Sequence, residues 1–262
     1  MIGAIGDDQY GSFCLRDLER HGVDISGIIT RENETTSFAI AVSDTKTGER
    51  SFMKRLGTAR RISYEEAPLE YLKSIKFFFI SILDDAVEQM VQTAKTTGAR
   101  IVVDADTYSD RLMELLPDID VFIASEYVYS RMFASGEPEP NCLEVMEKGP
   151  GIVVFTFGVE GCAGISKDGF FKIPAFKVKT VDTVGAGDVF HGAFMAGLLR
   201  GLPTDETARF ASAAAAIKCT RIGGRAGIPD LKTLERFLWD GTIDYTEIDE
   251  RVRFYSRGFE NV

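Results

Sequence analysis

Short apolar, β-branched or aromatic runs alternate along the chain with segments in which apolar residues recur at helical spacing. Five of these runs predict buried strands, at residues 1–5, 75–81, 100–104, 121–124 and 151–157. Helical spacing predicts helices at residues 11–21, 86–97, 143–148, 188–200 and 204–219. Because strands that alternate with helices are typical of parallel sheets joined by crossover helices, we expect a mostly parallel α/β sheet.

The pattern also contains two antiparallel elements. Residues 162–166 and 169–174 predict a meander after the parallel strands. Residues 37–44 and 50–54 flank a turn-rich connection at 45–49 and predict a hairpin. Such a hairpin is typical either of a lid over a pocket at the strand ends or of a plain sheet edge. The expected organisation is an α/β core at 1–36 and 59–239, a lid at 37–58, and a charged, partly ordered tail at 240–262.

Composition narrows the function classes. The chain has 262 residues, 45% of them apolar, and a formal net charge of −10, which disfavours nucleic acid as a partner. No apolar run approaches the roughly 20 residues that cross a bilayer, so we expect no membrane contact and a cytoplasmic protein. The four cysteines and two histidines lack metal-ligand spacing, so general-base chemistry is expected from a carboxylate.

The segment with the clearest chemistry lies at residues 181–190. Gly185, Ala186 and Gly187 immediately precede a predicted helix, where unobstructed backbone N–H groups and the helix dipole favour an anion such as a phosphoryl group. Asp188 follows in the first helical turn, within reach of a hydroxyl that attacks this anion. The alternative interpretation is an ordinary tight turn in which Asp188 is only the N-cap.

Residues 182–188, Asp-Thr-x-Gly-Ala-Gly-Asp, resemble the C-terminal signature of the ribokinase/PfkB family of carbohydrate kinases. Similar segments follow the family's order at Gly6-Asp7-Asp8-x-x-Gly11, at residues 48–50 and at Thr156-x-Gly158-x-x-Gly161. The resemblance implies a ribokinase-like, doubly wound sheet sandwiched by helices with a small β lid. It also implies ATP-dependent, Mg2+-assisted phosphoryl transfer to a sugar hydroxyl, with Asp188 as base and residues 185–187 as the anion hole.

The resemblance implies further site residues. On the nucleotide side these are Ser125, Thr156, Gly158, Gly161, Gly223 and Gly224. The helix and loop at 213–227 correspond to a region that borders the adenine and helps to hold a monovalent cation such as K+. Asp182 either orients the anion loop or lies near that cation. The lid hairpin also implies a surface for a homodimer.

Departures from the family pattern bear on the metal and the substrate. Ser125-Glu126-Tyr127-Val128 stands where many members carry Asn-x-x-Glu, a motif that helps to organise magnesium. Residues 104–106, 190–193 and 223–230 look most like sulfofructose kinases, and the Ser variant also occurs in ketohexokinases. Residues 55–59 resemble the lid-proximal segment of 2-keto-3-deoxygluconate kinases, which predicts that Arg55 faces an anionic sugar.

The sequence opens after the family's usual first strand and its Gly-Gly-x-x-x-Asn segment, both of which contact the sugar. We therefore expect either a start that is truncated or a sugar pocket that is incomplete. The main hypothesis is a sugar kinase that phosphorylates a ketose or a related derivative. The alternatives are a catalytically impaired nucleotide- or sugar-binding member of the same fold and a structural scaffold; the intact Asp188 favours the kinase.

Overall fold

The computed structural model describes residues 1–43, 50–134 and 136–258. The chain forms two compact units. Unit 1 comprises residues 1–71 and the chain from residue 254 onward, and unit 2 comprises residues 72–253. A short helix, α2 (Leu69–Leu72), includes the boundary between the first segment of unit 1 and the start of unit 2.

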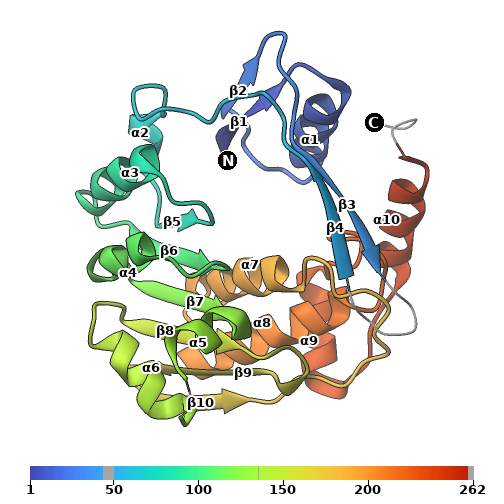
Figure 1. Ribbon diagram of the computed structural model, residues 1–262. Coiled ribbons are helices and arrows are strands. Elements are labelled where there is room, and N and C mark those ends of the chain that lie inside the picture. The colour runs from blue at the N-terminus through green and yellow to red at the C-terminus, as the bar shows by residue number, and fades with distance from the viewer. Residues whose placement is uncertain (44–49, 135, 259–262) are drawn as a thin grey trace. The chain divides into compact units, whose positions relative to one another are not determined.

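Unit 2 is built on a six-stranded sheet with the order β10-β9-β8-β7-β6-β5 (Figure 1). Its strands are β5 (Phe77–Ile80), β6 (Arg100–Ala105), β7 (Val121–Ser125), β8 (Ile152–Thr156), β9 (Cys162–Ser166) and β10 (Gly169–Ile173). Strands β5 to β8 are parallel, and β9 and β10 extend the sheet in the antiparallel sense. The predicted mostly parallel sheet and meander are confirmed. The apolar runs of β6 to β8 are buried on both faces, as parallel strands require.

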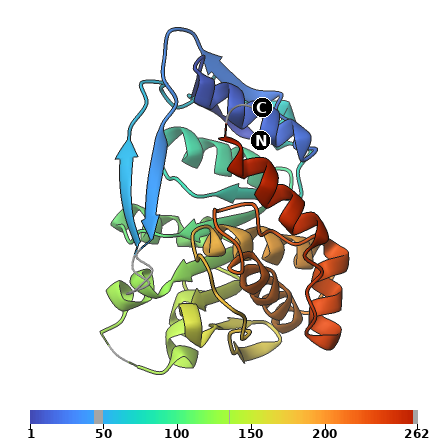
Figure 2. The same ribbon diagram turned by 90° about the vertical axis from the view of Figure 1, so that its right-hand side faces the viewer.

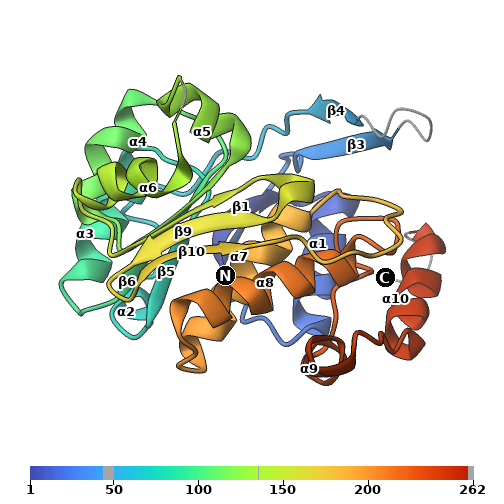
Figure 3. The same cartoon turned by 90° about the horizontal axis from the view of Figure 1, so that it is seen from below.

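Helices cover both faces of this sheet, as the view in Figure 3 shows. One face carries α3 (Asp85–Lys95), α4 (Asp110–Leu115), α5 (Glu126–Met132), α6 (Pro138–Met146) and the 3-10 turn η1 (Leu116–Asp118). The other face carries α7 (Ala186–Leu199) and α8 (Thr204–Lys218). Phe122 and Phe155 belong to the first core, with ring centroids 5.9 Å apart, and Phe194 belongs to the second. The expected doubly wound class is confirmed.

The two long helices α7 and α8 pack closely against each other. A β-carbon at Gly197 of α7 would lie 3.0 Å from Cγ2 of Thr207 on α8, so a larger residue would push the helices apart. Helix α9 (Leu231–Asp240) adds Leu234 and Phe237 to a third apolar cluster beside α8. The predicted helices at 188–200 and 204–219 are confirmed to within two residues of their bounds.

Unit 1 begins with a parallel pair of strands, β1 (Ile2–Gly6) and β2 (Gly27–Arg31), connected by α1 (Gln9–Arg20). The predicted strand at 1–5 is thus confirmed, but its partner is β2 and not a strand of the six-stranded sheet. The sequence pattern missed β2 because this five-residue strand opens on a glycine and is only partly buried.

The turn between β1 and α1 requires glycine at two positions. Asp8 caps α1, since its carboxylate accepts the N–H of Gly11 at 2.8 Å and the N–H of Thr36 at 2.9 Å. A β-carbon at Gly6 would lie 2.2 Å from the carbonyl oxygen of Glu34, and one at Gly11 would lie 2.2 Å from that of Gly6. The Gly6-to-Gly11 segment therefore needs its two glycines for backbone packing.

The predicted hairpin is present in unit 1 as β3 (Phe38–Ser43) and β4 (Arg50–Arg55), which lie side by side in Figure 2. Ile40 pairs with Met53, and Ala41 pairs with Phe52. The expected turn at 45–49 lies outside the described residues. Ile40, Phe52 and Met53 are each about half exposed, and strand alternation places Phe52 and Met53 on opposite faces. Both faces of the hairpin thus expose apolar side chains.

The C-terminal tail forms a helix, α10 (Thr246–Ser256), which the sequence analysis did not predict. Its last turn belongs to unit 1 and contacts α1. The Arg20 guanidinium lies 3.6 Å from the Phe254 ring centroid, and the Tyr255 hydroxyl donates to the buried Asp17 carboxylate at 2.8 Å. These long-range contacts, and not local periodicity, fix the end of the tail.

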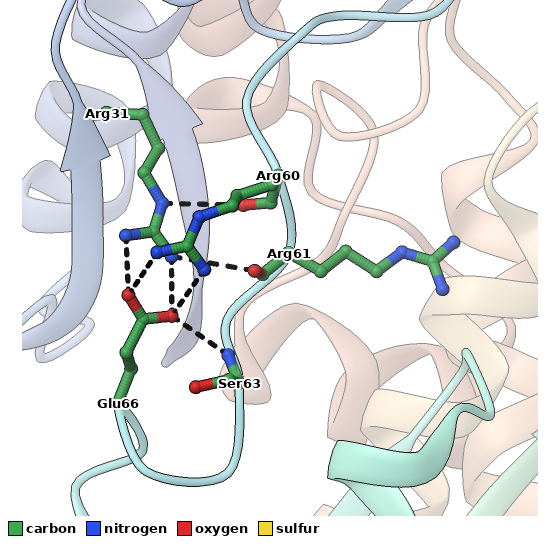
Figure 4. Close-up of polar contacts among 5 residues, drawn as sticks. All are labelled: Arg31, Arg60, Arg61, Ser63 and Glu66. Atoms are coloured by element: carbon green, nitrogen blue, oxygen red, sulfur yellow. Dashed lines mark hydrogen bonds and ion pairs between the residues drawn. The ribbon is translucent and has the colours of Figure 1, made fainter.

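A charged cluster holds the segment after the hairpin against β2 (Figure 4). Glu66 accepts two bonds from Arg31, at 2.7 and 2.8 Å, and two from Arg60, at 2.7 and 2.9 Å. It also accepts the N–H of Ser63 at 2.9 Å. The hydrogen-bonded guanidinium of Arg31, followed by that of Arg60, holds the pKa of Glu66 far below its usual range.

Replacement Glu66→Gln tests this cluster. We expect several-fold faster hydrogen exchange of the β1 and β2 amides at pH 7 than in the native protein, because the amide cannot accept both guanidinium forks. A depressed carboxylate pKa contributes stability above the unfolded-state value of 4.5, and this contribution is lost as the pH falls below it. The difference between the two proteins should therefore shrink below about pH 4.5. Glu32→Gln, the same change at an exposed neighbour of Arg31, is the control; equal effects of both changes would contradict the assignment.

Candidate active site

Polar residues of unit 2 gather where its parallel strands end. Asp104 lies at the end of β6, and Ser125 and Thr156 are the last residues of β7 and β8. Ser125 and Thr156 are partners in the β7–β8 register, so the structure brings these two predicted site residues together. In open α/β sheets, ligands bind at the carboxyl ends of the strands.

Ser125 has a feature that suits a ligand contact. Among the described residues, its Oγ is a buried oxygen without a hydrogen-bond partner, and it does not cap α5 although Ser125 precedes that helix. A buried hydroxyl of this kind costs free energy unless something bonds to it. Three residues further on, Val128 is fully buried in the apolar core, so the position of the family's glutamate offers no metal ligand here.

The loop after β8 contains the 3-10 turn η2 (Gly158–Glu160). Gly158 has a φ of +53°, and a β-carbon there would meet open space. Gly161 has a φ of +97°, and a β-carbon there would lie 2.0 Å from the carbonyl oxygen of Ile173. Gly161 is therefore required for the loop to pack against the end of β10. At Gly158, by contrast, the space beside the backbone is empty, so a ligand could approach it there.

The predicted anion loop forms the N-terminus of α7. Gly185, at a φ of +77°, is the N-cap and provides no side-chain cap, so Asp188 is the third helical residue and not the cap. The Ala186 N–H donates to the Thr183 carbonyl at 3.1 Å and is committed to the turn. The N–H groups of Gly187 and Asp188 lie in the first turn, where a helix offers no internal acceptor. A β-carbon at Gly187 would meet nothing within 4 Å, so the space in front of this turn is open.

The anion loop packs against the glycine-rich loop that contains Gly223 and Gly224. A β-carbon at Gly185 would lie 2.7 Å from the carbonyl oxygen of Gly224, which shows how closely the loops approach. Asp182 ties them together: its Oδ1 accepts the N–H of Val184 at 2.9 Å, and its Oδ2 accepts the N–H of Gly223 at 2.8 Å. Of the two roles expected for Asp182, these contacts are those of a residue that orients the anion loop.

Asp188 itself is exposed, and a buried histidine lies one turn further along α7. His191 Nδ1 lies 2.7 Å from the Gly187 carbonyl oxygen, which only accepts, so Nδ1 carries a proton. Its Nε2 lies 3.4 Å from Oδ1 of Asp104. Among the described residues, this second nitrogen is buried without a hydrogen-bond partner, and the Asp104 carboxylate is a charged group close to it.

The surroundings of Asp104 disfavour its charged form. Burial raises the pKa of Asp104, the charge of His191 opposes the rise, and the carboxylates of Asp106 and Asp188 add to it. The Asp188 carboxylate therefore raises the pKa of Asp104, which indicates that the end of β6 lies near the anion loop. The sequence analysis did not assign Asp104 or His191 to the site. The signal that could have found Asp104 is a carboxylate that directly follows the buried apolar run at residues 101–103.

Arg55, the residue expected to face an anionic sugar, belongs to unit 1. It is the last residue of β4, and its guanidinium carbon lies 6.0 Å from the ring centroid of Phe38. In the part of the chain that the structure describes, no cluster of three or more His, Cys, Asp or Glu side chains suits a metal ion. Within the same residues, no helix is long and apolar enough to cross a membrane.

Comparison with known proteins agrees with this geometry. The chain is 30% identical to a nucleoside kinase of Methanothermobacter thermautotrophicus, over 90% of this chain and 78% of the relative. It is 25% identical to a ribokinase of Bacillus subtilis, over 91% of this chain and 80% of the relative. Among solved structures, a putative ribokinase II from E. coli in complex with ATP and Mg2+ superposes with a TM-score of 0.83 at 26% identity, covering 91% of this chain and 82% of that one.

The family model described as pfkB family carbohydrate kinase matches residues 1–231, which is most of the chain and includes every candidate site residue in both units. The uncapped helix N-terminus, the exposed Asp188 and the polar edge of the parallel sheet all lie within that match. The protein thus belongs to the pfkB family of carbohydrate kinases.

Proposed function

We propose that the protein transfers the γ-phosphoryl group of ATP to a hydroxyl of a ketose or a related sugar derivative. The observation that carries this proposal is the uncapped N-terminus of α7, which has an open face at Gly187 and places the exposed carboxylate of Asp188 beside it. A transferring phosphoryl group needs charge stabilisation and positioning more than covalent chemistry, and this turn offers both.

The proposed roles of the chain's own groups follow from their geometry. The N–H groups of Gly187 and Asp188 stabilise the oxygens of the moving phosphoryl group, and the α7 dipole adds to them. The Asp188 carboxylate accepts the proton of the attacking sugar hydroxyl. The carbonyl of Gly187 is held by His191, which keeps the first turn of α7 in place beside Asp104.

The nucleotide is proposed to lie across the strand ends. Ser125 Oγ, which is buried without a partner in the described part of the chain, would bond to a polar group of ATP, and the open face of Gly158 leaves room for it. Thr156 borders this place, while Gly223 and Gly224 border the anion loop. The E. coli relative whose structure contains ATP and Mg2+ supports ATP as the nucleotide.

Magnesium fits the same region. Mg2+ takes oxygen ligands, usually keeps several waters and is commonly held by one or two carboxylates and substrate phosphates. The exposed carboxylate of Asp106, just beyond β6, and the phosphates of ATP would hold it. When bound, the ion supplies neutralisation of the phosphate charge, which a site with carboxylates at Asp104, Asp106 and Asp188 needs.

The second candidate is a catalytically impaired member that binds nucleotide or sugar without turnover. The exposed Asp188 argues against it, because loss of the base is the simplest route to an inactive site. The similarity to a nucleoside kinase favours including nucleosides among the acceptors tested. A coupled ADP-release assay over neutral, acidic, sulfonated and phosphorylated sugars and nucleosides separates the two candidates, since an impaired member releases no ADP with any of them.

Substitution Asp188→Asn is the direct test of the base. We expect turnover to fall by at least about 100-fold, the usual effect of removing a general base, while ATP binding stays nearly unchanged. Asp205→Asn removes a carboxylate from the first turn of α8 and is the matched control for the helix-terminus charge. Turnover by Asp188→Asn that stays close to the native value, or an equal loss in the control, would refute the assignment.

Arg55 is proposed to bind an anionic group of the substrate. A guanidinium binds carboxylate, sulfonate or phosphate through two parallel hydrogen bonds. We expect anionic ketose derivatives, such as a sulfofructose or a keto-deoxy sugar acid, to be phosphorylated faster than fructose. Arg55→Ala should reduce this preference in kcat/KM by about 10-fold, and Arg55→Lys should reduce it less, because the ammonium keeps the charge but loses the fork. Equal rates on neutral and anionic sugars would remove the role of Arg55.

The hairpin of unit 1 is proposed to pair two copies of the chain. Its two faces expose the apolar side chains of Ile40, Phe52 and Met53, and exposed apolar surface of this kind favours association with a partner. We expect sedimentation to show a dimer at micromolar concentration and Phe52→Ser together with Met53→Ser to give a monomer. The control is Val159→Ser, which changes a 94% exposed apolar residue outside the hairpin. A native protein that sediments as a monomer would rule out the pairing.

A further inference from the structure

A fully buried lysine lies at the end of α8. The side chain of Lys218 has no exposed surface and is among the largest completely buried side chains of the described residues. It follows the apolar core residues Ala213, Ala214 and Ile217 of the same helix. Lysine is almost never fully buried unless its ammonium is paired, so its interactions must offset a large desolvation cost. The sequence analysis gave no sign of this, because a lysine in an alanine-rich helix reads as a surface residue.

The ammonium of Lys218 points at the segment that leads into the anion loop. Its Nζ donates to the backbone carbonyl of Asp182 at 2.9 Å. Lys218 is also the last residue of α8, where the negative end of the helix dipole stabilises a cation. The charge therefore lies at a carbonyl only three residues before Gly185.

Further backbone contacts fix the same place. The N–H groups of Val181 and Asp182 both donate to the Cys219 carbonyl, at 2.8 and 3.1 Å. A β-carbon at Gly227 would lie 2.4 Å from the Lys218 carbonyl oxygen, so the glycine-rich loop returns onto this residue. Lys218 is thus at the centre of the packing that holds Asp182, and through it Val184 and Gly223.

This arrangement does not fit a monovalent cation at Asp182. The carboxylate of Asp182 already accepts two backbone N–H groups, and its carbonyl already accepts an ammonium. A K+ ion on that carbonyl would lie close to a buried positive charge and be repelled by it.

We propose that Lys218 is a built-in cation that holds the Asp182 segment and the anion loop in place, so that the protein works without an added monovalent ion. Lys218 acts as a positioning residue, because it contacts the backbone that carries the loop and not the reacting groups. The effect on turnover rests on the proposed kinase function, whereas the effect on the stability of unit 2 does not.

The test compares KCl, NaCl and tetramethylammonium chloride at equal ionic strength, by thermal unfolding and by turnover. The native protein should have the same unfolding midpoint in all three salts, and a turnover that K+ changes by less than twofold. A midpoint that K+ raises by several degrees over tetramethylammonium, or a turnover that K+ raises by 10-fold or more, would overturn the proposal. This comparison uses only the native protein. Its unfolding midpoints test the proposal even if the protein phosphorylates none of the sugars.

Two substitutions test the same idea in reverse. Lys218→Ala opens space beside the Asp182 carbonyl, so its lowered unfolding midpoint should rise again in K+ but not in tetramethylammonium. Lys218→Met fills the space with an apolar chain, so its lowered midpoint should not respond to K+. Lys179→Met, at an exposed lysine just before this segment, is the control and should match the native protein. If Lys218→Met matched the native protein in unfolding midpoint and turnover, the ammonium would have no role. If either variant failed to fold, the salt comparison on the native protein would decide whether the proposal holds.

Discussion

The close approach of two glycine-containing loops is the constraint on which the site depends. A β-carbon at Gly185 would lie 2.7 Å from the Gly224 carbonyl oxygen, so the anion loop cannot carry a side chain at this contact, and the Asp182 carboxylate bonds to the backbone of both loops. These contacts fix where α7 begins and which of its N–H groups remain open. A helix N-terminus held in this way is preorganised for an anion, since no backbone has to move when charge develops there. The buried ammonium of Lys218 strengthens the same junction from the core side.

Around this junction, unit 2 places its polar groups where a doubly wound fold exposes strand ends. Asp104, Ser125 and Thr156 lie at the carboxyl ends of three adjacent parallel strands, and apolar cores cover both faces of the sheet. The carboxylates of Asp106 and Asp188 raise the pKa of Asp104, and His191 Nε2 lies 3.4 Å from its Oδ1. A site with this much negative charge accepts a polyphosphate only together with cations, which is consistent with ATP delivered as its magnesium complex.

The sequence predicted the elements whose pattern is local. Strands β6, β7 and β8 were recognised from their continuous apolar runs. Helices α7 and α8 were recognised from apolar residues that recur at helical spacing. The anion loop was recognised from its small residues and its resemblance to a known signature. Strand β2 was missed because it opens on a glycine and is only partly buried, and helix α10 because its partner α1 lies far away in the chain. The Asp104–His191 pair and the buried Lys218 were missed because each is defined by a contact across more than 30 residues of chain.

Amide hydrogen exchange at the N-terminus of α7 tests the central claim most directly. The comparison is between the free protein and the protein with magnesium and a non-hydrolysable ATP analogue, at saturating concentration. We expect marked protection of the Gly187 and Asp188 amides, since the terminal phosphate becomes their acceptor, and no change at Thr233, whose amide already bonds to Asp230 at the start of α9. Protection at the strand ends near Ser125 without protection at Gly187 and Asp188 would show that the phosphate lies elsewhere and would contradict the account.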